Sequence, residues 1–494
     1  MAAPFRIYNT LSRSIETFEP LQPGHVRLYV CGMTVYDHCH VGHARAMTVF
    51  DAFARYLRHR GWKVTFVRNI TDVDDKIIQR AADNHTDAAA WAQRYVDSFH
   101  RDMAGLGLLS PDVEPRVTTS MPAILAMIAK LIERGHAYAA DGSVWFNVET
   151  FADYGRLSNQ KVEALRNPDD WAGKRKPADF AVWKAAKQGE PSWDSPWGPG
   201  RPGWHIECSA MASEALGESI DIHGGGLDLV FPHHENEIAQ SEGASGKCYV
   251  RYWMHNGMLT MGDKKMGKSL GNVFNIHNAL DAYPAEALRL YYLQNHYRSP
   301  LPWNDDALPD ALGMLSRLYE AREKAEAMRG QEDAELVAKQ LGADAAAVLA
   351  LGRGFAERFY KALDQDFSTA QALGQLFELA RAVNRFAAHK KANKRGGPVV
   401  APALAAFGLA RDALALMGMD TAAFHDEVKT KRMGALGIDA AAVEQALADR
   451  AAARQAKQWA RADAIRDQLA QKNIEVLDLP AGVQWRVRLT SNVT

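Results

Sequence analysis

The chain has few cysteines, no long apolar run and almost no net charge. It contains 4 cysteines in 494 residues, too few for the disulfide framework of small secreted domains. No stretch approaches the roughly 18 consecutive apolar residues of a membrane-spanning helix, so we expect no membrane span. The formal charge is -1, from 58 basic and 59 acidic residues. This balance argues against a protein that coats nucleic acid indiscriminately, but it allows a local basic surface.

The N-terminal segment also lacks the features of a leader. Residues 1–10 contain no apolar stretch followed by a small-residue cleavage site, and the segment before the first predicted strand includes Glu16 and Glu19. We therefore expect a cytoplasmic protein. A chain of this length exceeds what one hydrophobic core organises, so two to four domains are expected.

The first clear pattern along the sequence is that of a parallel sheet. Residues 26–31 form an apolar, β-branched run, residues 43–60 place apolar side chains at helical spacing, and residues 63–70 are again strand-like. The order strand, loop, helix, strand predicts a βαβ unit. Ligands of such sheets bind beyond the carboxyl ends of the strands, where the loop after the first strand lies.

The next part of the chain is irregular before the sheet pattern returns. A helix at 124–135 and a short strand at 143–148 precede a tract rich in tryptophan, proline and glycine. We interpret residues 120–215 as an insertion that splits the sheet domain. Strands are expected again at 219–223 and 251–259.

The last third of the chain is mainly helical. Residues 310–420 are rich in Ala, Leu and Glu with helical periodicity, which predicts a helix bundle, and the basic, glycine-containing tract 390–398 is expected to be a loop. Helical pattern at 442–471, followed by short strands at 473–479 and 484–489, predicts a small α/β domain.

Two segments some two hundred residues apart carry phosphate-binding chemistry. His40 and His43 lie near the N-terminus of the helix predicted at 43–60, where imidazole donors and the helix dipole favour phosphate, and Gly42 allows close backbone approach. Lys265 and Lys268 lie in a glycine-containing loop that can close over a triphosphate and stabilise charge on departing pyrophosphate. Either segment alone also occurs as a capping segment or an exposed basic turn. Together, in this order across a βαβ framework, they predict an ATP site.

Cysteine, histidine and glutamate residues near these segments suit a metal ion. Cys31 ends the first strand, Cys208 follows the tryptophan-rich tract, and Glu237 lies four residues after His233 and three after His234. In a helix either histidine shares a face with Glu237, so spacing leaves both open. Two sulfurs, an imidazole and a carboxylate suit Zn²⁺.

The other two cysteines, Cys39 and Cys248, also lie near these segments. Because an isolated cysteine is usually a small apolar filler, we expect both to have that role.

With these residues the chain resembles the class I aminoacyl-tRNA synthetases, and specifically the cysteinyl-tRNA synthetases. The resemblance extends over nearly the whole chain and includes NITDVDDKI (69–77), KPADFAVWK (176–184) and the terminal stretch 462–486. The family's usual second motif is KMSKS. Here Gly267 replaces the central serine, which removes one phosphate contact and adds backbone freedom.

The resemblance implies a four-part α/β architecture. A Rossmann-like parallel-sheet catalytic domain is split by an insertion, and a helix bundle and a small α/β domain follow; both of these hold the tRNA, the last near the anticodon. The expected ranges are 1–120 and 216–310, 121–215, 311–420, and 421–494. A monomer is also implied.

The resemblance further implies a two-step reaction. The carboxylate of L-cysteine attacks the α-phosphorus of ATP to give cysteinyl-adenylate, and the cysteinyl group then passes to the 3′-terminal ribose of tRNA(Cys). No side-chain nucleophile is needed, because positioning and charge stabilisation supply the rate. The groups implied in this role are Mg²⁺ and the side chains of His40, His43, Lys265 and Lys268.

For the amino acid, the resemblance implies one Zn²⁺ per chain. It selects His233 over His234 and gives the ligands Cys31, Cys208, His233 and Glu237. The substrate thiolate joins as an additional ligand, a bond that the hydroxyl of serine does not match near neutral pH. Trp204 is implied to pack against the bound cysteine, Asp228 to receive its ammonium group and Thr71 to line the same pocket. From the residues alone, Trp204 is equally a core residue and Asp228 a turn residue.

The nucleic-acid partner has weaker support. Residues 421–494 carry 11 basic and 9 acidic side chains, an excess of only two positive charges. Trp485, beside Arg486 and Arg488, either stacks on an unpaired base or covers the core of its own domain.

Two alternatives remain. A cysteine-activating ligase that transfers cysteine to an amino sugar resembles the catalytic half and lacks the C-terminal domain, so residues 421–494 favour tRNA. A non-catalytic relative would be expected to have lost the histidines or the loop lysines, and none is lost.

Overall fold

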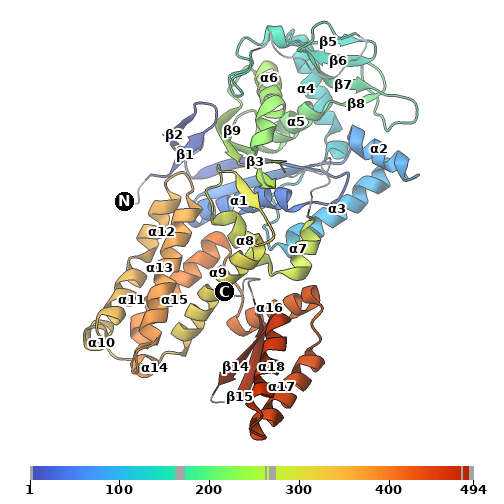
Figure 1. Cartoon of the computed structure of the whole chain (residues 1–494). Coiled ribbons are helices and arrows are strands. Elements are labelled where there is room, and N and C mark those ends of the chain that lie inside the picture. The colour runs from blue at the N-terminus through green and yellow to red at the C-terminus, as the bar shows by residue number, and fades with distance from the viewer. Residues whose placement is uncertain (1–3, 162–172, 262–263, 266–273, 480–481, 489–494) are drawn as a thin grey trace.

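A computed structural model describes residues 4–161, 173–261, 264–265, 274–479 and 482–488 (Figure 1). Its centre is a sheet of four parallel strands in the order β10-β9-β3-β4. The bounds are β3 (His25–Thr34), β4 (Lys63–Thr71), β9 (Ile220–Gly226) and β10 (Val250–Asn256). The sheet domain is interrupted between β4 and β9, as the sequence predicts.

The helix α1 (Val41–His59) connects β3 to β4 and buries apolar side chains against the sheet. The predicted helix at 43–60 and the predicted strands at 26–31 and 63–70 are therefore confirmed. After β4 come α2 (Asp75–Asp83) and α3 (Ala88–Gly105), and a small N-terminal hairpin is formed by β1 (Arg6–Asn9) and β2 (Ser14–Thr17).

The predicted strand at 251–259 is divided in two. β10 ends at Asn256, and the backbone N–H of Gly257 donates to the carbonyl of Tyr297, 2.8 Å away. Leu259 then begins β11 (Leu259–Met261), which belongs to a separate three-stranded sheet with β12 (Lys264–Lys265) and β13 (Leu301–Trp303). The chain leaves the central sheet at Gly257, because β10 before it pairs with β9, whereas β11 after it pairs with β12 and β13.

The insertion has its own antiparallel sheet of four strands, at the top of Figure 1. These are β5 (Ala137–Ala140), β6 (Ser143–Phe146), β7 (Phe180–Ala185) and β8 (Gly200–Pro202). The helices α4 (Met121–Glu133), α5 (Trp204–Leu216) and α6 (Glu235–Ser245) pack between this sheet and the central one, and their apolar faces share one core with β7 and β10.

Helices make up the bundle, which packs beside α1 and α8. After α7 (Ile276–Ala282) and α8 (Ala285–Leu293), the bundle contains α9 (Ala307–Ala327), α10 (Ala334–Leu341), α11 (Ala343–Arg353), α12 (Phe355–Leu363), α13 (Thr369–Ala387), α14 (Ala392–Arg395) and α15 (Gly397–Leu414). The prediction of a loop at 390–398 is wrong, because α14 and the start of α15 lie in this range. Ala392 is buried, and the N–H of Gly397 donates to the carbonyl of Arg329 at 2.8 Å. Packing of one small apolar residue overrides the loop-like composition.

A buried ion pair attaches the bundle to the helix that begins with the HVGH segment. Arg289 of α8 is buried and pairs with Asp51 of α1, and its Nε donates to the carbonyl of Leu414 at 2.6 Å. The bundle and α1 are thereby held in one orientation.

The C-terminal part contains α16 (Thr421–Leu436), α17 (Ala440–Gln455), α18 (Trp459–Gln471), β14 (Ile474–Leu479) and β15 (Gly482–Val487). The two strands pair antiparallel, as predicted. Trp485 is 9% exposed, its indole N–H donates to Glu444 at 2.6 Å, and Lys429 lies over its ring at 4.0 Å. Of the two interpretations of Trp485, the structure therefore favours the core residue.

Within the described ranges, no helix combines the length and apolar character required to cross a bilayer. Cys39 is buried as expected, whereas Cys248 is exposed, so the expected filler role is wrong for Cys248.

Candidate active site and metal centre

A cleft of about 1130 Å³ opens at the carboxyl ends of the central strands. Its lining includes Cys31 near the end of β3, Gly226 at the end of β9 and Asn256 at the end of β10. The first turns of α1 and α5 also contribute. The cleft thus lies where the sequence places the ligands of a parallel sheet.

The HVGH segment begins α1 with a reciprocal cap. The N–H of Gly42 donates to Nδ1 of His40 at 3.1 Å, and the N–H of His40 donates to Nδ1 of His43 at 3.2 Å. Because both Nδ1 atoms accept, each ring carries its proton on Nε2. The two rings stack with centroids 3.6 Å apart, and both residues line the cleft. The cap therefore sets both histidines in the tautomer that can donate a hydrogen bond to a phosphate.

Position 42 requires glycine for a local structural reason, in addition to the expected close approach of its backbone to a ligand. A Cβ atom at this position would lie 2.9 Å from the ring of His40. Any side chain would displace the cap, so glycine is required for the histidine geometry itself.

The backbone of the HVGH segment and of Cys39 pairs with residues 274–276, which follow the second predicted ATP segment in sequence. The N–H of Val41 donates to the carbonyl of Phe274 at 2.9 Å, and the N–H of Ile276 donates to the carbonyl of Cys39 at 3.1 Å. Lys265 is in β12, where its backbone pairs with Thr260. Lys268 and Gly267 lie outside the described residues.

The predicted metal ligands come together in one buried cluster. The sulfurs of Cys31 and Cys208 are 3.8 Å apart, Cys31 Sγ is 3.6 Å from Glu237 Oε1, and His233 Nε2 is 3.1 Å from the same oxygen. The Phe231–Pro232 bond is cis and His233 lies in a π-helical turn just before α6. His233 nevertheless shares a face with Glu237.

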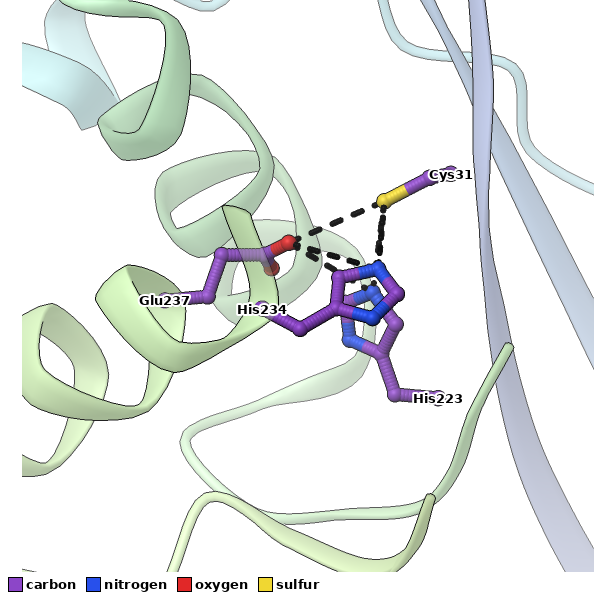
Figure 2. A group of neighbouring side chains, drawn as sticks. All are labelled: Cys31, His223, His234 and Glu237. Atoms are coloured by element: carbon purple, nitrogen blue, oxygen red, sulfur yellow. Dashed lines mark hydrogen bonds and ion pairs between the residues drawn. The ribbon is translucent and has the colours of Figure 1, made fainter. Parts of the chain in front are cut away.

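A second group of ligands shares two members with the first. Figure 2 shows the rings of His223 and His234 directed at Cys31 and Glu237. His223 Nε2 is 3.4 Å and His234 Nε2 is 3.3 Å from the Cys31 sulfur, and they are 3.6 and 3.9 Å from Glu237 Oε1. The sequence reasoning missed His223, although a histidine in a buried strand just before three glycines is an unusual feature.

Both groups fit a tetrahedral zinc ion. With Zn–S near 2.3 Å and Zn–N or Zn–O near 2.0–2.1 Å, neighbouring ligand atoms lie roughly 3.3–3.8 Å apart. The observed separations fall close to that range in each group. Trp204, which lines the cleft, packs its ring on His233 with centroids 4.3 Å apart. The group with Cys208 and His233 therefore borders the space that a substrate would enter.

Electrostatics in the cluster favours a cation. Burial raises the pKa of the Cys31 thiol, whereas the pKa of Cys208 is held low because it accepts a hydrogen bond from Cys31. Burial also raises the pKa of Glu237 and lowers the pKa values of His223 and His234. Two thiols and a carboxyl group are thus buried beside neutral imidazoles, and a divalent cation would stabilise the deprotonated forms of the thiols and the carboxyl group.

Outer contacts fix the histidine rings. Nδ1 of His234 is 2.7 Å from Nε2 of His255, and Nδ1 of His223 is 3.4 Å from the hydroxyl of Tyr249. Burial lowers the pKa of His255 to about 3, so this contact is neutral at ordinary pH. Such second contacts orient the nitrogens that face a metal.

The three residues expected to contact cysteine are placed differently from one another. Trp204 is 38% exposed and Asp228 is exposed, and both line the cleft. Thr71 is buried and is not among the described lining residues; its hydroxyl lies 3.2 Å from Oε2 of Glu207, which does line the cleft. Glu207 was missed by the sequence reasoning, although it directly precedes Cys208.

Comparison with known proteins gives the family. Residues 17–313 match the model of the tRNA synthetases class I (C) catalytic domain, residues 358–407 a DALR domain, and residues 440–486 the cysteinyl-tRNA ligase anticodon binding domain. Over 485 residues the chain is 50% identical to the cysteine–tRNA ligase of Alkalilimnicola ehrlichii, covering 97% of this chain and 99% of that protein. It is 48% identical over 489 residues to that of Geobacter sulfurreducens, with 98% and 99% covered.

The chain belongs to the cysteinyl-tRNA synthetase family. The predicted resemblance and the prediction of an enzyme are confirmed. The DALR and anticodon-binding matches fall inside the predicted ranges 311–420 and 421–494, whereas the catalytic match, 17–313, spans both catalytic ranges and the insertion and ends three residues beyond 310. The domain boundaries themselves stay a prediction.

Solved structures agree on the fold. Methionyl-tRNA synthetase of Mycobacterium tuberculosis in complex with methionyl-adenylate superposes with a TM-score of 0.59 at 17% identity, covering 81% of this chain and 93% of that one. The leucyl enzyme of Agrobacterium radiobacter K84 gives 0.58 at 12% identity, covering 83% and 86%. The expected α/β fold class with a parallel sheet is confirmed.

Proposed function

We propose that this enzyme attaches L-cysteine to tRNA(Cys) with ATP, through a cysteinyl-adenylate, and selects cysteine with one Zn²⁺. The observation that carries the proposal is that Cys31, a member of the cluster with Cys208, His233 and Glu237, lines the same cleft as His40 and His43. A thiolate-binding group and a phosphate-binding group in one cleft suit an amino acid whose thiol is held while its carboxylate is activated.

The ATP half rests on hydrogen-bond donors at a helix start. His40 and His43 carry their protons on Nε2, and the N-terminus of α1 adds its dipole. We propose that they stabilise the charge that develops as pyrophosphate leaves, with Lys265, Lys268 and Mg²⁺ in the same role. The carboxylate of cysteine is itself the nucleophile, so these groups position and stabilise.

The cysteine half rests on the ligand set. Cys31, Cys208, His233 and Glu237 would hold the zinc ion, which supplies a bond to sulfur that an alcohol oxygen does not match near neutral pH. Trp204 would pack on the side chain, and Asp228 would receive the ammonium group. Each ~1.4 kcal/mol of difference between sulfur and oxygen at the metal gives a factor of ten in selectivity.

The proposal that tRNA is the acceptor rests on the C-terminal region. The range matched by the anticodon binding domain lies within residues 421–494, and the cysteine–tRNA ligases of similar sequence are covered over 99% of their length. This coverage supports tRNA rather than an amino sugar as the acceptor. We propose the bundle, 311–420, as the second tRNA-binding region, and a monomer remains our prediction.

An isotope-exchange experiment tests the proposal. Exchange of pyrophosphate into ATP is expected to depend on cysteine and to be at least about a hundred-fold weaker with serine, because a few kcal/mol separate the two at zinc. Removing the metal with a chelator should abolish the cysteine dependence, and adding Zn²⁺ should restore it. Charging of total tRNA with cysteine is then measured, and we expect cysteinyl-tRNA to form. Equal exchange with serine, or no charging of tRNA, would contradict the proposal.

The exposure of the tryptophans in the C-terminal region supports a proposal for base stacking. Trp485 is buried, whereas Trp459 at the start of α18 is 58% exposed and has the exposed cations Lys457 and Arg461 beside it. It lies inside the range matched by the anticodon binding domain. We propose that Trp459 stacks on an unpaired base of the tRNA.

Trp459→Ala is expected to raise the KM for tRNA by about ten-fold or more, since stacking contributes ~1–3 kcal/mol per base. Pyrophosphate exchange, which needs no tRNA, should be unchanged. Trp459→Phe keeps an aromatic face and should retain most of the affinity. Leu336→Ala, which removes an exposed apolar side chain from the bundle, is the control. A tRNA KM that stays the same in Trp459→Ala would exclude the stacking role.

A further inference from the structure

One carboxylate in the cleft has no cation beside it. Glu207 lies in the first turn of α5, between Trp204 and the metal ligand Cys208, and is 2% exposed. It lines the cleft, and its recorded hydrogen-bond partner is the hydroxyl of Thr71 at 3.2 Å. Among the residues that the structure describes, no lysine, arginine or histidine forms an ion pair with it.

The neighbouring carboxylates on this wall of the cleft have structural partners. Asp74 caps α2 through a backbone N–H at 2.8 Å. Asp75 pairs with Lys184 at 3.0 Å and with Arg201. Glu207 differs from both because it is buried with one neutral donor. Burying a carboxylate without a cation costs several kcal/mol, so a cation that arrives from the cleft would stabilise the charged form of Glu207.

A series of hydrogen bonds fixes the direction of the contact between Thr71 and the Glu207 carboxylate. The N–H of Gly32 donates to Oδ1 of Asn69 at 2.8 Å, so Nδ2 of Asn69 faces Thr71, with Nδ2 and Oγ1 3.4 Å apart. Thr71 therefore accepts from Asn69 and donates its own proton to Oε2 of Glu207. The direction of this series of hydrogen bonds is fixed, because it begins at a backbone N–H, which can only donate. Oε2 of Glu207 must therefore accept the hydrogen bond from Thr71.

We propose that Glu207 receives the α-ammonium group of the substrate amino acid and that Thr71 and Asn69 are positioning residues for it. An ammonium group has three donors and a full positive charge, and Glu207 adjoins the residues proposed to hold the cysteine side chain. Asp228, the other carboxylate proposed to receive the ammonium group, lines the same cleft. The inference rests on the proposed function, because it assumes that the cleft binds cysteine.

The test compares three thiols that differ in charged groups. Cysteine has an ammonium and a carboxylate group, cysteamine has only the ammonium group, and 3-mercaptopropionate has only the carboxylate group. Their affinities for the zinc-loaded, full-length enzyme and for Glu207→Gln are measured by calorimetry. Glutamine keeps an oxygen that accepts from Thr71 but has no charge. We expect Glu207→Gln to weaken cysteine and cysteamine by about ten-fold or more, because a charge-assisted hydrogen bond is lost, and to leave 3-mercaptopropionate unchanged.

Controls separate recognition from folding. Glu214→Gln removes an exposed carboxylate from the same helix and should change none of the affinities, and zinc content is measured for every variant. If Glu207→Gln does not fold, Thr71→Val, which cannot donate, should weaken cysteine and cysteamine selectively, whereas Thr71→Ser should restore them.

Two results would overturn the inference: an equal loss for all three thiols, or no loss for cysteine. Failure of the proposed function has another signature, since the unmodified enzyme would then bind none of the thiols.

Discussion

Replacing Cys208 by serine is expected to remove the metal ion and, with it, the enzyme's use of cysteine. Serine has nearly the same size but supplies no thiolate near neutral pH, so one of two sulfur ligands is lost. Bound zinc should fall from one per chain to nearly none. Cysteine-dependent pyrophosphate exchange should fall by at least about a hundred-fold, because even contacts outside the metal's own ligands contribute 10–100-fold. Elemental analysis and the exchange assay measure the two quantities.

The matched control is Cys248→Ser, which changes the same atom at an exposed position outside both ligand groups. It should keep its zinc and its activity. His223→Gln distinguishes the two groups, since His223 belongs only to the group without Cys208. If His223→Gln loses the metal while Cys208→Ser retains it, the ion lies in the second group and our ligand assignment is wrong.

Replacing His40 by asparagine is expected to abolish most of the activation step while leaving zinc in place. Asparagine is a good N-cap and can still accept the N–H of Gly42, but it lacks the Nε2 proton proposed to contact phosphate. Pyrophosphate exchange should fall by roughly 10²–10³-fold, the effect of losing one preorganised donor. Zinc content, measured in parallel, should be unchanged. Lys268→Ala is expected to behave in the same way.

His59→Asn at the opposite end of α1 serves as the control, because it is exposed and distant in sequence from the cap. Its exchange rate should equal that of the unmodified enzyme. A His40→Asn variant with full exchange activity would remove His40 from the proposed ATP site. A loss of zinc in that variant would show that the two halves of the cleft are not independent.

Strongly patterned segments of the fold could be predicted from the sequence. Residues 26–31 and 63–70 are rich in apolar and β-branched side chains, which is typical of strands buried in a parallel sheet. The tract 390–398 was predicted wrongly as a loop. Its lysines and glycines describe a polar surface, whereas the burial of Ala392 depends on how α14 packs against α13 and α15.

The sequence by itself determined which chemistry is available: a paired histidine segment at a helix start, two cysteines, and a histidine–histidine–glutamate segment. These are local patterns, and their types and spacing are written in the chain. Only the tertiary structure decided which of these residues meet. Cys31 of β3 and Cys208 of α5 are 177 residues apart in sequence and 3.8 Å apart in space, and His223 joins them from β9. Likewise, Thr71 reaches Glu207 across 136 residues, and Trp459 is exposed while Trp485 is buried. Such distances follow from how strands and helices pack, because side-chain contacts between distant segments depend on the whole core and not on any one segment.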